Sequence, residues 1–178
     1  MASPKIEIYI PADKIQTRIA ELGAQISRDY GGRPLVLIGI LKGSFMFMAD
    51  LVRHLESSVR IEFMGTRSYE KGTSSSGQVQ LTKDLDKPID GEDVLLVEDI
   101  VDTGFTARYL LQTLAGRGPN SLSLCTLLDR TSRRIVQIPV DFRCFEIPDR
   151  FVVGCGLDYQ QLYRNLSYIA VMKHERSQ

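Results

Sequence analysis

Three carboxylates at the end of an apolar run are the residues of this sequence best suited to chemistry. Glu98 and Asp99 close a run that begins at Val94, and Asp102 follows shortly after. Carboxylates accept hydrogen bonds from sugar hydroxyls and bind Mg²⁺, often through water. These acids therefore indicate a site for hydroxyl groups and a divalent cation, although solvated acids at a sheet edge would have the same spacing.

The turn that follows the acids favours a different chemical group. It runs from Thr103 through Gly104 and Phe105 to Thr106, where a helix is expected to begin. A helix start offers unpaired N–H groups and a partial positive charge, so a phosphate monoester fits. A helix capped by Asp102 or Thr103, with no ligand, is the alternative. A ligand with ribose hydroxyls, bound Mg²⁺ and a terminal phosphate would satisfy the acids and the turn together.

The elements that must position these residues read as an α/β fold. Three apolar runs, at Pro34–Leu41, Val94–Val97 and Ser121–Asp129, are typical of strands buried on both faces of a parallel sheet. Apolar residues at helical spacing from Ile15 to Ile26 predict an amphipathic helix. We therefore expect a single domain over residues 1–178, with a central, mostly parallel sheet flanked by helices and a small hood from the N- and C-terminal segments.

Three polar clusters follow predicted strands. They are Lys42-Gly43-Ser44, the turn from Glu98 to Thr106, and Asp129-Arg130. Ligands of open α/β sheets bind beyond the carboxyl ends of the strands, so these clusters are expected at one site. The polar segment at about 70–78 lacks apolar residues, and it predicts either a plain hairpin loop or a flexible active-site lid.

Composition narrows the class of protein. The 178 residues carry 22 basic and 22 acidic side chains, so nucleic acid is not the expected partner. The three cysteines lack CxxC spacing, no apolar run could span a membrane, and no signal peptide is visible. We expect a cytoplasmic protein. The P-loop and GxGxxG nucleotide motifs are both missing.

At this point the residues resemble a known family. Val97–Thr106 is similar to the phosphoribosyl-pyrophosphate motif of type I phosphoribosyltransferases. Five further segments match the hypoxanthine-guanine members of that family in order: LKGS at Leu41–Ser44, RSY at Arg67–Tyr69, LLDR at Leu127–Arg130, IPDRFVVGCGLDY at Ile147–Tyr159 and YRNL at Tyr163–Leu166. The resemblance covers nearly the whole chain.

The resemblance implies a purine salvage reaction. Such enzymes transfer the 5-phosphoribosyl group of phosphoribosyl pyrophosphate to N9 of hypoxanthine or guanine, giving IMP or GMP and pyrophosphate, with Mg²⁺ as the cofactor. It also implies a homodimer or homotetramer. Two alternatives remain open: a sister transferase that prefers xanthine, and a non-catalytic, RNA-binding regulator on the same fold.

The resemblance also assigns roles to individual residues. Asp102 is the expected acid–base group at the purine N7. The phosphoribosyl group would be held by Glu98, Asp99, Asp102, Thr103, Gly104, Phe105 and Thr106, pyrophosphate by Lys42, Gly43 and Arg164, the purine by Arg130, Phe151, Val152 and Asp158, and metal by Glu98, Asp99 and Asp158, with Arg67, Ser68 and Tyr69 on the flexible loop. By spacing alone, Phe151 reads as core packing, and the resemblance reverses that reading.

One position departs from the family pattern. Arg130 stands where many members carry a lysine that donates to the purine O6. Arginine is also an obligate donor, but it is bulkier and planar. The choice among hypoxanthine, guanine and xanthine is therefore left open by the sequence.

Overall fold

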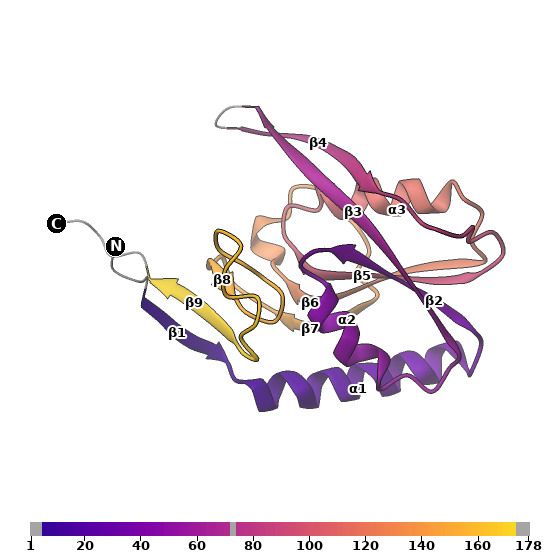
Figure 1. The fold of residues 1–178 in the computed structure, drawn as a ribbon, viewed down its shortest axis with the longest axis horizontal. Coiled ribbons are helices and arrows are strands. Elements are labelled where there is room, and N and C mark those ends of the chain that lie inside the picture. Colours follow the sequence, from indigo (N-terminus) through magenta and orange to yellow (C-terminus); the bar gives the residue numbers. More distant parts are fainter. Residues whose placement is uncertain (1–4, 72–73, 174–178) are drawn as a thin grey trace.

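The chain forms a large central sheet and a small second sheet, seen together in Figure 1. The computed structural model describes the backbone of residues 5–71 and 74–173 and, outside 68–78 and 173, their side chains. The central sheet has the order β4-β3-β2-β5-β6-β7 and the second sheet the order β1-β9-β8. Their bounds are β1 Lys5–Ile10, β2 Leu35–Leu41, β3 Val59–Lys71, β4 Ser74–Lys83, β5 Asp93–Val101, β6 Ser121–Asp129, β7 Phe142–Glu146, β8 Val152–Val153 and β9 Ile169–Lys173.

The central sheet is mostly parallel, as the apolar runs predicted. Strands β3, β2, β5, β6 and β7 pair in parallel, and only the edge strand β4 runs antiparallel. Residues Leu35–Ile40 of β2 and residues 93–98 of β5 are buried along their whole length. Both faces of these strands are covered, which explains why their sequences do not alternate between polar and apolar residues.

Helices cover both faces of the central sheet. Helices α1 (Ala12–Tyr30) and α2 (Phe45–Val52) lie on one face and α3 (Phe105–Ala115) on the other (Figure 1). The core is split accordingly, because Leu37 and Leu95 pack with α1, whereas Ile38 and Leu96 pack with α3. Within the described parts of the chain, no helix is both long and apolar enough to cross a membrane.

The second sheet is the expected hood. It joins the first described strand, β1, to the last, β9, in antiparallel register (Figure 1, left). The two-residue strand β8 pairs with β9 on its other side, with Val152 opposite Val171. The hood thereby fixes Val152 and its neighbour Phe151, both of which the sequence assigned to the purine.

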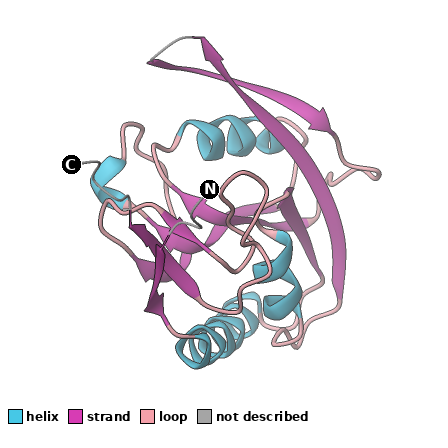
Figure 2. Cartoon of the chain, turned by 60° about the vertical axis from the view of Figure 1, so that its left-hand side comes forward, coloured by secondary structure: helices cyan, strands magenta, loops and turns pink. Residues whose placement is uncertain are grey.

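A long hairpin of β3 and β4 projects from the central sheet (Figure 2). Strand β3 continues to Lys71, and β4 begins at Ser74. Residues 70–71 and 74–78, expected in a loop, are therefore strand, while 72–73 lie outside the described residues. Strands that leave the body of a protein bury few apolar side chains. The sequence of this segment therefore lacks the alternating apolar residues that would predict a strand. The mobility of this segment stays a prediction.

The first prediction concerns the core. Leu37 in β2 is fully buried, so Leu37→Ala should lower the free energy of unfolding by about 2–5 kcal/mol. Leu162→Ala removes the same atoms from a side chain that is 61% exposed, and it should change stability by less than about 0.5 kcal/mol. Urea unfolding of both variants measures the difference. Equal losses would contradict the described packing.

Candidate active site

The three polar clusters meet at one edge of the central sheet. Strand β2 ends at Leu41, β5 at Val101 and β6 at Asp129, and β5 lies between the other two in parallel register. Since parallel strands point their carboxyl ends the same way, the segments that follow them are brought together. The site expected from the sequence is therefore geometrically possible.

A small cavity of about 80 Å³ lies at the start of α3. Glu98, Asp102, Thr103, Gly104 and Thr106 line it together with Ile100, Val101 and Ala107. Gly104 is the residue before the helix, and no described side chain caps the free N–H groups. The capped-helix alternative, with Asp102 or Thr103 as the cap, is therefore wrong. The exposed N–H groups suit an anion.

The carbonyl oxygens of this turn are directed away from the cavity by neighbouring donors. The Thr103 carbonyl accepts from the amides of Ile135 (2.9 Å) and Val136 (3.0 Å). Gly104 adopts a φ of +91°, and a Cβ there would overlap the Val136 carbonyl, so this turn requires glycine. With its carbonyls occupied, the turn can present its N–H groups to a ligand.

The adjacent acids Glu98 and Asp99 face different cavities. Glu98 is 6% exposed and lines the small cavity of the turn. Asp99 lines a larger cavity of about 300 Å³. Burial raises the pKa of Glu98 well above its usual value, and the charge of Asp99 raises it further. Burial also raises the pKa of Asp99, to about 6, against an opposing effect of Arg164. Protonation of these acids would weaken their repulsion of a phosphate.

Two glycines let the loop after β2 pack against the acids. A Cβ at Gly43 would overlap the Asp99 carboxylate, and a Cβ at Gly156 would overlap the Gly43 carbonyl. The peptide bond between Leu41 and Lys42 is cis. The loop at Lys42-Gly43 thus lies in contact with Asp99 and with the segment before Asp158.

A cationic cavity of about 490 Å³ lies between this loop and the β3–β4 hairpin. Four basic residues line it, namely Lys42, Arg67, Lys83 and Arg164, together with Leu41, Gly65, Thr66, Thr82 and Gln161. Arg164 pairs with Asp158 at 2.7 Å and donates to the Gly156 carbonyl at 2.6 Å. Four positive charges without an acid in the lining suit a polyanion.

The 300 Å³ cavity combines acids, arginines and an aromatic ring. Asp102, Arg130, Phe151, Val152 and Asp158 line it, with Asp99, Ile100, Arg133 and Leu157. Arg130 is 7% exposed along its side chain and reaches Asp102 at 3.2 Å. Phe151 is 46% exposed and meets Tyr159 edge-on, with ring centroids 5.8 Å apart. A planar ring with hydrogen-bonding edges fits such a lining.

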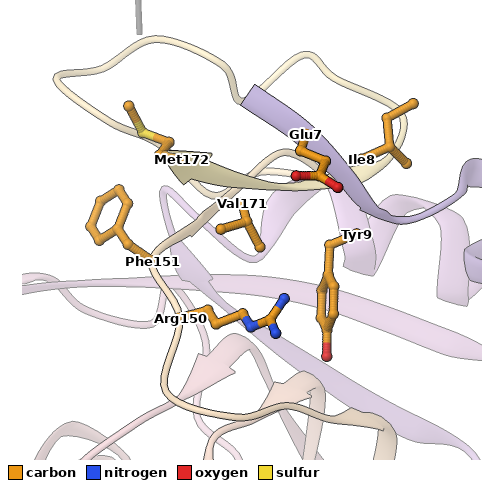
Figure 3. Close-up of a pocket in the computed structure, with 7 residues that line it drawn as sticks. All are labelled: Glu7, Ile8, Tyr9, Arg150, Phe151, Val171 and Met172. Carbon is orange, nitrogen blue, oxygen red and sulfur yellow. The ribbon is translucent and has the colours of Figure 1, made fainter. Parts of the chain in front are cut away.

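A further cavity lies under the hood, and Phe151 lines both it and the 300 Å³ cavity. Figure 3 shows Phe151 directed toward Met172 and Arg150 directed toward Tyr9. The Arg150 guanidinium lies 5.3 Å from the centre of the Tyr9 ring, and the hollow measures about 320 Å³. None of the acids of the β5 turn lines this hollow, so we place the chemistry in the 300 Å³ cavity instead.

The structure brings most predicted residues together and adds others. Around the three cavities lie Lys42, Glu98, Asp99, Asp102, Thr103, Gly104, Thr106, Arg130, Phe151, Val152, Asp158 and Arg164 from the sequence prediction. Arg67 lines the cationic cavity, whereas the side chains of Ser68 and Tyr69 lie outside the described residues. Sequence reasoning missed Arg133, Arg134 and Gln161; the run of arginines after Asp129 was the available signal.

Metal binding would need more than these side chains. Among the described residues, no three His, Cys, Asp or Glu side chains are gathered closely enough to hold an ion. Asp158 and Asp99 do line the same 300 Å³ cavity. Mg²⁺ commonly takes only one or two carboxylates and completes its shell with water and substrate phosphate, so the acids present fit that cation.

Comparison with known proteins identifies close relatives. A family model described as the phosphoribosyl transferase domain matches residues 9–160. The chain is 52% identical to hypoxanthine phosphoribosyltransferase of Escherichia coli K12 over 166 residues, 92% of this chain and 93% of the relative. It is 48% identical to hypoxanthine-guanine phosphoribosyltransferase of Staphylococcus aureus over 169 residues, 95% of this chain and 94% of the relative.

Solved structures of similar proteins match the fold of this chain. A crystal structure of hypoxanthine-guanine phosphoribosyltransferase from Bacillus anthracis matches with a TM-score of 0.91 at 42% identity, covering 96% of this chain and all of the other. The Trypanosoma cruzi hypoxanthine phosphoribosyltransferase in complex with its product IMP matches with a TM-score of 0.88 at 43% identity. That match covers 96% of this chain and 95% of the other.

The second prediction follows from the raised pKa of Asp99. Its pKa is about 6 in the folded chain and near its ordinary value of 3.8 when unfolded, so the folded state binds the proton more tightly. This contribution to stability is complete below pH 3.8 and is lost as the pH rises through 6. Asp99→Asn should therefore be more stable than the parent at pH 8, by about 1–3 kcal/mol, with the gap closing toward pH 4. Urea unfolding across this range measures the gap, and a pH-independent gap would contradict the assignment.

Proposed function

The chain belongs to the phosphoribosyl transferase family, and we propose that it is a purine salvage enzyme acting on hypoxanthine or guanine. It transfers the 5-phosphoribosyl group from phosphoribosyl pyrophosphate to N9 of the base, giving IMP or GMP and pyrophosphate. One observation carries this proposal. The acids Glu98 and Asp99, the turn before α3 and the 300 Å³ cavity lie together at one edge of the central sheet. The comparisons give no support to the xanthine-preferring or RNA-binding alternatives.

The phosphoribosyl group would span the 80 Å³ cavity at the start of α3 and the 300 Å³ cavity beside it. The 5′-phosphate accepts hydrogen bonds from the N–H groups of the turn from Asp102 to Thr106, including Phe105. Glu98 and Asp99 face the ribose hydroxyls. Pyrophosphate lies in the cationic cavity against Lys42, Gly43 and Arg164, which would explain the surplus of positive charge there.

Enzymes of this family generally use a divalent metal, and we propose Mg²⁺ for this chain. The residues that would hold it are the acids Glu98, Asp99 and Asp158; Asp99 and Asp158 line the same cavity and could share one ion, whereas Glu98 lines the cavity beside it. Bound there, the ion would supply positive charge beside the departing pyrophosphate. The raised pKa values of Glu98 and Asp99 fit a cation, because a buried carboxylate without one is driven to bind a proton.

The base would occupy the 300 Å³ cavity. Phe151 stacks on the purine, the Val152 backbone reads its edge, Arg130 donates to O6, and Asp158 lies near the 2-position. As N9 forms its bond to the sugar carbon and pyrophosphate leaves with the bonding electrons, Asp102 takes the proton from N7. A carboxylate within hydrogen-bonding reach of the purine is suited to this general-base step.

The β3–β4 hairpin is the proposed lid. Arg67 already lines the cationic cavity, and Ser68 and Tyr69 follow it along the same strand. Movement of the hairpin tip over bound substrate would exclude water from a cation-like sugar centre. For the whole molecule, we propose a cytoplasmic homodimer or homotetramer that does not bind nucleic acid.

The third prediction tests the function through base choice. Hypoxanthine and guanine carry an acceptor at O6, whereas adenine carries an amine, and Arg130 can only donate. A site with a buried donor left unpaired should reject adenine by at least about tenfold to a hundredfold. Xanthine should be the poorest 6-oxopurine, because its 2-carbonyl would oppose Asp158. Turnover with the four bases in competition, followed by absorbance, measures the order. Efficient use of adenine would contradict the role of Arg130.

The fourth prediction concerns Asp102. Asp102→Asn keeps the shape of the side chain but removes the proton acceptor, so transfer should slow about 10²- to 10⁴-fold. Binding of phosphoribosyl pyrophosphate, measured by calorimetry, should be largely retained. Unchanged turnover would remove Asp102 from the chemistry without affecting the assignment of substrates.

A further inference from the structure

We propose that Arg133 is a positioning residue that holds the Asp102 carboxylate while Arg130 is engaged with the purine. This inference rests on the proposed function. Arg133 ends the short 3-10 helix η1 (Thr131–Arg133), which follows β6, and its side chain lines the base cavity. Its guanidinium lies 3.8 Å from Oδ2 of Asp102. The family motifs do not include Arg133, and the proposed reaction assigns it no role.

The backbone after η1 keeps Arg133 beside the acid. Arg134 donates from Nε to the Asp102 carbonyl at 3.0 Å, and it also pairs with the buried carboxylate of Asp129. The amides of Ile135 and Val136 both donate to the Thr103 carbonyl. Because three hydrogen bonds tie this segment to the turn, Arg133 stays close to Asp102.

The two oxygens of the Asp102 carboxylate have different surroundings. Oδ2 faces two guanidinium groups, that of Arg130 at 3.2 Å and that of Arg133 at 3.8 Å. Oδ1 is buried and has no hydrogen-bond partner among the described residues. Because Oδ1 is covered, Oδ2 is the oxygen that a purine N7–H would approach. The two guanidinium groups fix the position of that oxygen.

Two arginines are needed because the nearer one has other partners. Arg130 also donates to the Arg150 carbonyl at 2.6 Å, and its proposed partner in the complex is the purine O6. Arg133 is 49% exposed and approaches the same Oδ2, but it is not assigned to the purine. Asp149 lies 3.9 Å from Arg133 and 4.0 Å from Arg130, so it offsets the repulsion between the two cations.

The test compares three single variants of the full chain. Arg133→Gln should lower kcat for hypoxanthine by about threefold to thirtyfold, the range for coupled side chains, with the KM for phosphoribosyl pyrophosphate unchanged. Arg133→Lys keeps the charge and should recover most of the loss. Arg53→Gln is the matched control, since Arg53 is a 69% exposed arginine paired with Asp50 on the surface of α2, and it should match the parent.

A second arm separates positioning from general damage. If Arg133 acts through Asp102, then Arg133→Gln should cause no further fall in kcat when it is added to Asp102→Asn. Unchanged kcat for Arg133→Gln, or an equal fall in the Asp102→Asn background, would overturn the inference. An inactive parent chain would instead overturn the proposed function, so the two failures are distinguishable.

Discussion

The site depends on the burial of two adjacent carboxylates at the end of a central strand. Glu98 is buried and Asp99 is half-buried, they face different cavities, and partial loss of water raises the pKa of both. Charged groups in such surroundings are stable only with a cation or a set of donors. A ligand that brings a metal ion or hydroxyl donors would therefore stabilise the ionised form of both acids.

The glycines around the acid pair follow from that burial. Gly43 lies so close to the Asp99 carboxylate that no side chain fits between them, and Gly156 in turn accommodates the Gly43 carbonyl. The loop that would hold pyrophosphate thus contacts both the acid that would hold ribose and the segment that leads to Asp158. Because these parts are closely packed, a shift of the loop would move its neighbours. The proposed sites for pyrophosphate, ribose and base are therefore structurally linked.

Much of this architecture was predictable because it depends on local patterns. The apolar runs of β2, β5 and β6 identified a parallel sheet, and that sheet brings the following turns to one edge without further information. A hairpin loop was one of the two alternatives for residues 70–78, but the extension of β3 and β4 into that segment was missed, because strands outside the core carry no hydrophobic periodicity. The alternative of a helix capped by Asp102 or Thr103 was wrong, because Gly104 directly precedes α3.

The contacts of the arginines could not be predicted, since they join residues far apart in the chain. Arg134 reaches back to the Asp102 carbonyl, and Arg130 reaches forward to the Arg150 carbonyl, which precedes the aromatic wall of the base cavity. The same guanidinium of Arg130 contacts Asp102 at 3.2 Å. A lysine has one ammonium group and cannot span two such acceptors in a fixed plane, whereas the fork of arginine can. Arg130, a departure from the family pattern, therefore links the proposed general base Asp102 to the wall of the base cavity.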